Sequence, residues 1–262
     1  MNGPNLTRAF ARNASESAYP NLWQGLVAAW APPGAPRHAT RLWDYSGNGN
    51  HGTIRNGANW TIGKNGHALN FDGTDDDVIG DTPGKNFPVG NQSRTVSCWI
   101  KAPSWTGDKG LLHWGHNGEF PAAANFHLVA GSAGNILWGN GFGDGILSGS
   151  INCADNRWHC ITGIYSSSTN LATLYVDGRI DATDYLEQVP STGSSDYWRI
   201  AKFLSNAGAW PGRIEGILLY NRLLLRSEIL SIATGASPFY SMPSKILLKP
   251  KKQSQSFAYL VC

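Results

Sequence analysis

Short runs of apolar residues, separated by turn residues, follow one another along the chain from Gly25 onward. Runs of four to eight residues that are rich in β-branched and aromatic side chains, and that end in Gly, Pro, Asn or Asp, are typical of strands. Strands spaced this closely predict a β-sandwich or barrel. The predicted strands are Leu26–Trp30, Gly52–Ile54, Ala68–Phe71, Thr95–Lys101, Gly110–Trp114, Asn125–Val129, Ile136–Trp138, Trp158–Tyr165, Ala172–Val176, Tyr197–Lys202 and Arg213–Tyr220.

Three of these runs carry most of the argument, because their side chains alternate and their ends carry turn signals. In the run at 95–101, Val96, Cys98 and Ile100 fall on one face of the predicted strand. The runs at 158–165 and 171–176 are joined by Ser166–Asn170, a polar connection of hairpin length. The second of them ends in Asp177–Gly178, a dipeptide that favours tight hairpin turns. Adjacent antiparallel strands are therefore expected here.

The two ends of the chain differ from this pattern. Residues 1–22 have no sustained periodicity, and we expect an N-terminal arm there. Residues 23–236 form the predicted domain, which includes one short helix at Arg226–Ala233, with Ser227 as its N-cap and Gly235 as its stop. Residues 237–262 mix Pro, Lys and Ser without a period, and we expect a tail. Such ends often become ordered only against a neighbour, so other protein subunits are the predicted partners of the arm and the tail.

Composition agrees with this organisation. A chain of 262 residues with 41% hydrophobic content can bury one large core, and Gly 31, Pro 14 and Trp 11 against only 15% charged residues favour an all-β domain. The net charge of +3 owes much to four lysines of the tail, so no broad basic face is expected and nucleic acid is excluded as a predicted partner. No apolar run is long enough for a secretory signal or a membrane span, and we expect a soluble protein.

The four cysteines lack the paired spacing of a zinc site. They are Cys98, Cys153, Cys160 and Cys262. Cys98 and Cys160 lie in predicted strands, where free cysteines commonly act as small buried apolar residues. A cross-strand disulfide between these two remains the alternative.

Several motifs, in sequence order, resemble laminin-G-like domains of the concanavalin A-like lectin and glucanase superfamily. The resemblance covers about residues 25–233, and it implies a two-sheet antiparallel jelly-roll sandwich with one short C-terminal helix and extended terminal segments. The motifs are Gly25–Trp30, Asp44–Gly52, Ala68–Gly73, Asp75–Val78, Thr95–Lys101, Asn156–His159, Leu174–Gly178, Gly212–Arg222 and Ser227–Ile229.

The groups that catalysis would need are missing. Glucanases of the superfamily use two closely spaced carboxyl groups on one strand, since glycoside hydrolysis requires a pair about 5 to 10 Å apart. None of the glutamates of this chain lies within four positions of another. The sequence also lacks a Gly-x-Ser-x-Gly elbow between a strand and a helix. We therefore expect that the protein is not an enzyme.

The resemblance implies one possible calcium ion, which relatives of this fold often bind through carboxylates and a backbone carbonyl. Asp44 and Glu215 occupy two of the corresponding positions, and they are the candidate metal ligands. The acid that would follow the first strand is replaced here by Ala31-Pro-Pro33. The alternative is that Asp44 caps a turn and that Glu215 is solvated. The run Asp75–Asp77 is expected to be a polar turn.

Tryptophans are the candidate ligand-binding residues, because flat rings at strand ends can stack on sugar faces. The candidates are Trp105, Trp114, Trp138 and Trp210, with Trp198 considered beside them; the alternative for each is an anchor in the core. His113, His116 and His127 are close in sequence, but we expect strand alternation to separate them.

Two functional hypotheses follow. The first is a non-catalytic structural protein of a virion, a capsid decoration or fibre component, that displays the sandwich outward and is anchored by its arm and tail. The second is a carbohydrate-binding, lectin-like module of a cellular surface or secreted protein. The expected location is accordingly the virion surface or an extracellular face.

Overall fold

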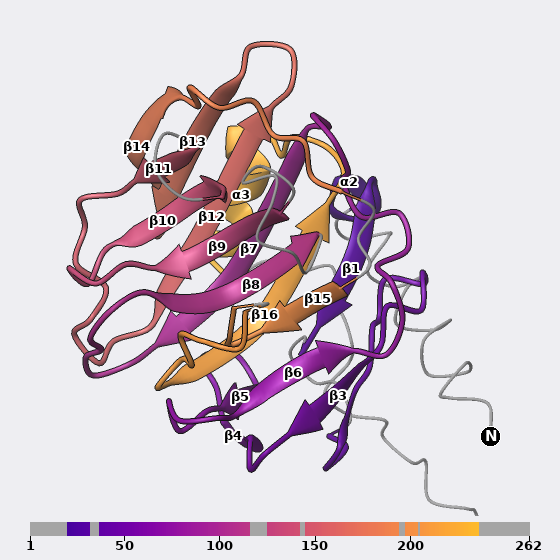
Figure 1. The fold of residues 1–262 in the computed structure, drawn as a ribbon, viewed down its shortest axis with the longest axis vertical. Coiled ribbons are helices and arrows are strands. Elements are labelled where there is room, and N and C mark those ends of the chain that lie inside the picture. The colour runs from indigo at the N-terminus through magenta and orange to yellow at the C-terminus, as the bar shows by residue number, and fades with distance from the viewer. Residues whose placement is uncertain are drawn as a thin grey trace, which may run out of the picture.

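The computed structural model describes residues 20–31, 37–115, 125–141, 145–193, 197–203 and 205–235. In these residues two antiparallel sheets of eight strands each pack face to face (Figure 1), so the predicted two-sheet sandwich is confirmed. The predicted tail and nearly all of the predicted arm lie outside the described residues.

The first sheet, called sheet A, follows the order β14–β13–β12–β7–β16–β5–β4, and β1 also pairs with β16. Its strands are β1 (Leu26–Trp30), β4 (Asn59–Ile62), β5 (His67–Asn70), β7 (Arg94–Lys101), β12 (His159–Ser166), β13 (Leu171–Val176), β14 (Arg179–Tyr185) and β16 (Arg213–Tyr220).

The second sheet, called sheet B, follows the order β11–β10–β9–β8–β15–β6–β3–β2. Its strands are β2 (Arg41–Leu42), β3 (Gly52–Arg55), β6 (Asp77–Gly80), β8 (Lys109–Gly115), β9 (Asn125–Ala130), β10 (Ile136–Asn140), β11 (Ile146–Ser148) and β15 (Tyr197–Ile200).

The main core lies between the two sheets, because alternate side chains of both sheets point inward. Val96, Cys98 and Ile100 all contribute to it, as the alternation predicts. The rings of Trp30 and Trp198, from opposite sheets, stack with their centroids 4.5 Å apart. Burial of each such side chain stabilises the fold by roughly 1.5 to 3 kcal/mol.

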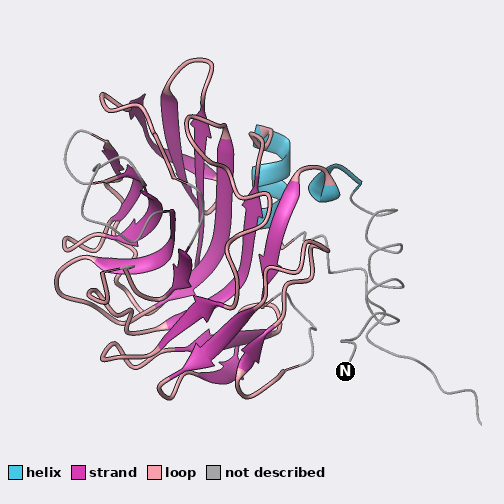
Figure 2. Cartoon of the chain, turned by 45° about the vertical axis from the view of Figure 1, so that its right-hand side comes forward, coloured by secondary structure: helices cyan, strands magenta, loops and turns pink. Residues whose placement is uncertain are grey.

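A second apolar layer covers part of the outer surface of sheet A. Two helices, α2 (Pro20–Trp23) and α3 (Arg226–Ala233), lie on this side of the sandwich (Figure 2). Ile229 and Ile232 of α3 pack in one cluster with Trp99, Cys160 and other residues of sheet A. Sheet A is therefore buried on both faces where this layer lies, so its strands β7 and β12 are buried along nearly their whole length.

The structure contains every strand that the sequence predicts, within two residues at each boundary, and adds β2, β4, β6, β11 and β14. The hairpin between β13 and β14 is confirmed, with Asp177 and Gly178 both at positive φ. The helix bounds are also confirmed, but the predicted cap is wrong. The N-cap is Leu225, whose backbone N–H donates to the Glu228 carboxylate, whereas Ser227 lies inside the helix.

The two strand cysteines lie on opposite faces of sheet A. Cys98 is opposite Ile161, and Cys160 is opposite Trp99, so the cysteines occupy neighbouring positions whose side chains point in opposite directions. Cys98 belongs to the main core, whereas Cys160 belongs to the outer layer. Both thiols are free and buried, which contradicts the disulfide alternative and confirms their interpretation as small buried residues.

Candidate functional site

The tryptophans selected from the sequence lie in the core. Trp105 is 8% exposed, and Trp114, Trp138, Trp198 and Trp210 are 0% exposed. Their rings contact one another and other aromatic rings; Trp105 and Trp210, for example, have centroids 5.1 Å apart. None of them presents a ring face to solvent in this structure, and the burial agrees with the alternative of core anchors. Their ligand-binding role stays a prediction.

Asp44 fixes a loop against the first strand. Its Oδ1 accepts the backbone N–H groups of Ala29 and Ser46 at 2.9 and 2.8 Å, and its Oδ2 accepts the N–H of Asn50 at 2.9 Å. A buried carboxylate that accepts several backbone donors is a common turn-stabilising arrangement. Both oxygens of Asp44 are thus engaged by the chain itself.

Glu215 is also engaged by backbone donors. Its carboxylate accepts the N–H groups of Lys64 and Asn65, in the turn between β4 and β5. Glu215 is fully buried, so the alternative of a solvated side chain is wrong. Burial raises the pKa of Glu215, while the two amide hydrogen bonds act to lower it.

The described residues do not place Asp44 or Glu215 in a group of three potential metal ligands. The group that they do contain is Asp72, Asp75 and Asp76, whose carboxylate oxygens lie within 4.8 Å of one another. Part of this group is a hydrogen-bonded turn, because Asp72 accepts the N–H of Thr74 and Asp76 accepts the N–H of Asp72. Calcium binding by Asp44 and Glu215 therefore stays a prediction, and the donor set does not favour it.

The outer surface of sheet B carries a set of polar and aromatic side chains that the sequence analysis did not select. In β15, Trp198 and Ile200 point into the core, so Tyr197 and Arg199 point outward. We call the outward set the sheet B face: Arg41, Thr53, Arg55, Asp77, Ile79, Asp81, His113, His127, Tyr197 and Arg199. Strands β9, β8, β15, β6 and β3, which carry most of this set, lie side by side in Figure 1, and β2 pairs with β3.

Strand register orders these residues into a row. Arg199 is opposite His113 on one side and Ile79 on the other, and His113 is opposite His127. The expectation that alternation separates His113 from His127 is wrong, because the two residues form a direct cross-strand pair with ring centroids 5.2 Å apart. His116 lies outside the described residues.

One part of the sheet B face is buried. Asp77 is fully buried and forms ion pairs with Arg55 at 2.6 Å and Arg199 at 2.5 Å. Burial lowers the pKa of His113 to about 4. Burial also lowers the pKa of His127, and the nearby His113 lowers it further. Both imidazoles are therefore neutral at neutral pH, and this part of the face has a structural role.

The other part of the sheet B face is open. Tyr197 is 46% exposed, and its neighbour across the strand pair is Gly115, which has no side chain to cover the ring. Gly80 lies against the ring of Trp198, and Asp81, which follows Gly80, points to the outer surface like Asp77 and Ile79. Asp81 accepts the Thr53 hydroxyl at 2.6 Å and pairs with Arg41 at 3.0 Å.

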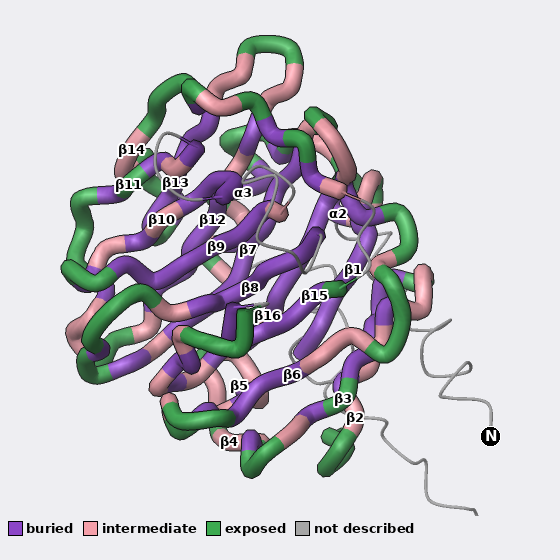
Figure 3. The backbone as a smooth tube through the Cα atoms, in the orientation of Figure 1, coloured by how far each residue is buried: buried purple, intermediate pink, exposed green. Residues whose placement is uncertain are grey.

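These open groups are suited to a hydroxyl-rich ligand. An aromatic ring offers an apolar platform, and a carboxylate, a hydroxyl and a guanidinium on the same face of the sheet offer acceptors and donors. The alternation around Trp198 is the sequence signal that could have identified Tyr197. Figure 3 shows that exposure on this side of the molecule is concentrated in the loops, while the central strands of the sheet are buried.

Comparison with known proteins gives the fold and the family. A family model of laminin G type, described as the concanavalin A-like lectin/glucanases superfamily, matches residues 72–230, more than half of the chain. No curated protein matches the sequence. Among the described residues, no helix is long and apolar enough to cross a membrane.

Solved structures with a similar fold include two toxin binding domains and one domain of an arabinanase. The binding domain of Paraclostridial Mosquitocidal Protein 1 has a TM-score of 0.64 at 16% identity over 81% of this chain and 52% of that chain. Domain 4 of AbnA, an extracellular arabinanase from Geobacillus stearothermophilus solved with arabinotriose, has a TM-score of 0.62 at 18% identity over 79% and 98%.

The receptor binding domain of botulinum neurotoxin D has a TM-score of 0.60 at 14% identity over 82% of this chain and 54% of that chain. The chain thus spans about half the length of the two toxin domains and nearly the full length of the arabinanase domain. Identities this low establish a shared fold alone.

Proposed function

Because the chain belongs to the concanavalin A-like lectin/glucanases superfamily, we propose that it is a non-catalytic, lectin-like module that binds a glycan on the open part of the sheet B face. The fold does not determine the ligand, so the proposal depends on the site. The observation that carries it is the half-exposed ring of Tyr197 on the same face of sheet B as the hydrogen-bonded group of Arg41, Thr53 and Asp81.

The charge of this group favours a neutral sugar. The Asp81 carboxylate is compensated by the Arg41 guanidinium, so the two together carry no net charge. A pyranose or furanose ring stacked on Tyr197 would present its hydroxyls to oxygen and nitrogen atoms of both polarities. The arabinotriose complex of the AbnA domain supports a glycan as the ligand class.

The roles of the toxin domains support a binding function more broadly. Two of the similar structures are the binding domain of an insecticidal protein and the receptor binding domain of a neurotoxin. Together with the sequence, which lacks the paired carboxyls of the glucanases, they favour recognition over catalysis. An extracellular or particle-surface location follows from this proposal.

The test is glycan binding by the protein and by a pair of matched variants. Screening on a glycan array, followed by calorimetry with the best neutral oligosaccharide, is expected to give binding that Tyr197→Ala weakens about tenfold or more, equivalent to about 1.4 kcal/mol. Tyr185→Ala is the control, because Tyr185 is 66% exposed but lies on β14 of sheet A. No binding at millimolar sugar, or an equal loss in both variants, would contradict the proposal.

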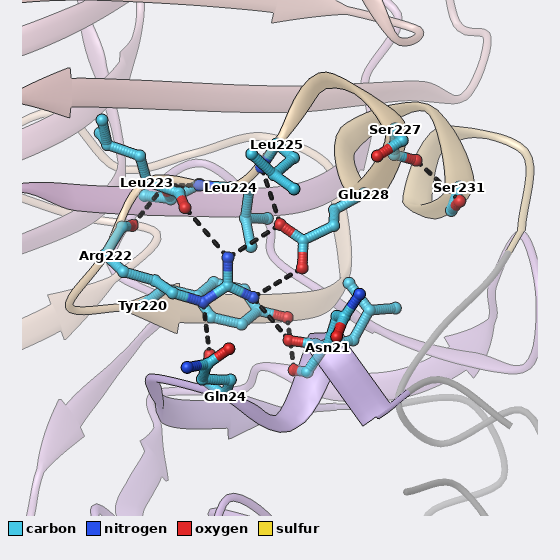
Figure 4. Close-up of polar contacts among 12 residues, drawn as sticks. Asn21, Gln24, Tyr220, Arg222, Leu223, Leu224, Leu225, Ser227, Glu228 and Ser231 are labelled. Carbon is cyan, nitrogen blue, oxygen red and sulfur yellow. Dashed lines mark hydrogen bonds and ion pairs between the residues drawn. The ribbon is translucent and has the colours of Figure 1, made fainter. Parts of the chain in front are cut away.

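A virion component remains the second candidate, and one observation favours an anchored, outward-facing module. Arg222 donates hydrogen bonds to the carbonyls of Asn21 and Gln24 and pairs with Glu228 of α3 (Figure 4). The first and last described elements are therefore joined on the side of sheet A, away from the sheet B face. Protease-sensitive ends in a protein that is monomeric under all conditions would count against this candidate.

A further inference from the structure

His159 lies between two carboxylates, and both of its ring nitrogens are used. Its Nδ1 is 2.9 Å from Oδ2 of Asp177, and its Nε2 is 3.1 Å from Oδ1 of Asp155. The His159 side chain is only 11% exposed, at the start of β12. It thus connects the loop before β12 to the turn between β13 and β14.

This geometry selects one protonation state. A neutral imidazole carries a single N–H, so one of its nitrogens would direct a lone pair at a carboxylate oxygen. The imidazolium donates from both nitrogens and satisfies both contacts. The two carboxylates therefore stabilise the cation, with hydrogen bonds of the charge-assisted kind.

The groups around the pair hold the carboxylates in place. Oδ1 of Asp177 accepts the backbone N–H of Cys160 at 2.8 Å, and Asp155 accepts the backbone N–H and Nε of Arg157. Lys64, in the turn between β4 and β5, adds its positive charge near Asp177. The charged groups that face His159 are thus the carboxylates of Asp155 and Asp177. The nearby cations interact with these carboxylates: Arg157 with Asp155 and Lys64 with Asp177.

The turn that His159 holds is in contact with α3. Gly178 follows Asp177, and a methyl group added to Gly178 would lie 3.1 Å from Cβ of Ala233 and 3.2 Å from Cδ1 of Leu230. The space between the turn and the helix is therefore smaller than a methyl group needs, and a shift of the turn toward α3 would press on Leu230 and Ala233. Glu228 of the same helix holds Arg222, which in turn holds residues 21 and 24 (Figure 4).

We propose that His159 is a protonation-dependent latch: its imidazolium pins the β13–β14 turn beneath α3, and loss of the proton loosens α3 and, through Arg222, the N-terminal turn α2. The contacts form a continuous path from the ring to the two ends of the described domain. The latch controls how firmly those ends are attached, independently of what the sheet B face binds.

The direction of the pH dependence follows from the same contacts. The hydrogen bond to Asp177 raises the pKa of His159, partial burial opposes this, and Asp155 raises the pKa further. For Asp155, burial alone would raise the pKa, but bonds from Arg157 and His159 outweigh it and lower the pKa to about 2. A histidine with a raised pKa gives its full stabilisation below its unfolded value of about 6.5 and loses it as the pH rises through the folded value.

Amide hydrogen exchange at pH 6 and pH 9, corrected for the intrinsic rates, tests the latch in the full chain. We expect protection of the amides in α3 to fall about tenfold or more between the two pH values. In His159→Gln, the protection should be the same at both. The control is His38→Gln, which changes an exposed histidine and should retain the fall of the unmodified protein.

Equal protection at pH 6 and pH 9 in the unmodified protein, or a fall that persists in His159→Gln, would overturn the proposal. A measurement that needs no variant complements these experiments. Titration of the His159 ring by nuclear magnetic resonance should give a pKa above about 6.5. A value below this would overturn the latch even if His159→Gln failed to fold.

Discussion

The outer surfaces of the two sheets differ in what covers them. On sheet A, α2 and α3 add a second apolar layer that includes Trp99, Ile229 and Ile232. On sheet B, the outward side chains are largely polar, with ion pairs around Asp77 and an exposed ring at Tyr197. A covered face contributes stability, whereas an open polar face leaves groups available for recognition. In the proposed function, the covered side of the sandwich serves attachment and the open side serves binding.

The largest expected loss of stability comes from disrupting the buried part of the sheet B face. Asp77→Ala removes the carboxylate that compensates two guanidinium groups and leaves that of Arg199 almost fully buried. Breaking a buried ion pair in this way costs about 3 to 5 kcal/mol. Urea denaturation should show this loss, and Asp81→Ala, at the open part of the face, should change the stability by no more than about 1 kcal/mol. Similar losses in the two variants would remove the distinction between the two parts.

The next effect concerns the layer over sheet A. Ile229 lies on the buried side of α3 and is 1% exposed. Ile229→Ala would leave a cavity between the helix and sheet A, and such cavities cost about 2 to 5 kcal/mol of stability. Ser227→Ala is the control on the same helix, because Ser227 is exposed and should matter by less than about 0.5 kcal/mol. Both values come from denaturant unfolding at constant pH. An equal response would mean that α3 does not contribute to a packed layer.

A smaller loss is expected where the first and last elements meet. Arg222→Met keeps the length of the side chain but removes its hydrogen bonds to Glu228, Asn21 and Gln24. Hydrogen bonds of charged groups contribute about 1.5 to 3 kcal/mol in this setting. Arg226→Met, at an exposed position of α3, is the control. If the two variants unfold at the same denaturant concentration, the junction does not hold the helix.

The smallest expected effect is the change in Tm when calcium is removed. Both oxygens of Asp44 and both of Glu215 accept backbone N–H groups, so removal of calcium should leave the Tm unchanged. Differential scanning calorimetry with a chelator and with added calcium measures this. A Tm that rises with calcium in the unmodified protein but not in Glu215→Gln would support the metal site predicted from the resemblance.

The sequence predicts the strands whose side chains alternate between the core and the outer surface. It does not predict a strand whose side chains are exposed to solvent on both faces. The run at 95–101 is readable because Val96, Cys98 and Ile100 all face the core. β14 has no such signal, since most of its residues, including Ile180 and Tyr185, are exposed or half-exposed. Its position at the edge of sheet A leaves it without a buried face to shape its pattern.

The candidate site was harder to predict than the fold, because residue type does not tell a core ring from a surface ring. Tryptophan is the largest apolar side chain, and its burial at Trp114 and Trp138 removes more area from water than any smaller residue would. Tyr197 was recoverable from its alternation with Trp198. The group of Arg41, Thr53 and Asp81 was not, because pairing between strands far apart in the sequence brings it together.

The junction at Arg222 also bears on how the module can be carried by other proteins. Since α2 and the start of α3 are bonded to the same guanidinium, a polypeptide enters and leaves the sandwich on one side, within about the 12 Å length of an eight-residue helix. A host protein could therefore accept the entire unit as an insertion in a single surface loop. In such an insertion, the sheet B face with Tyr197 would point away from the host protein.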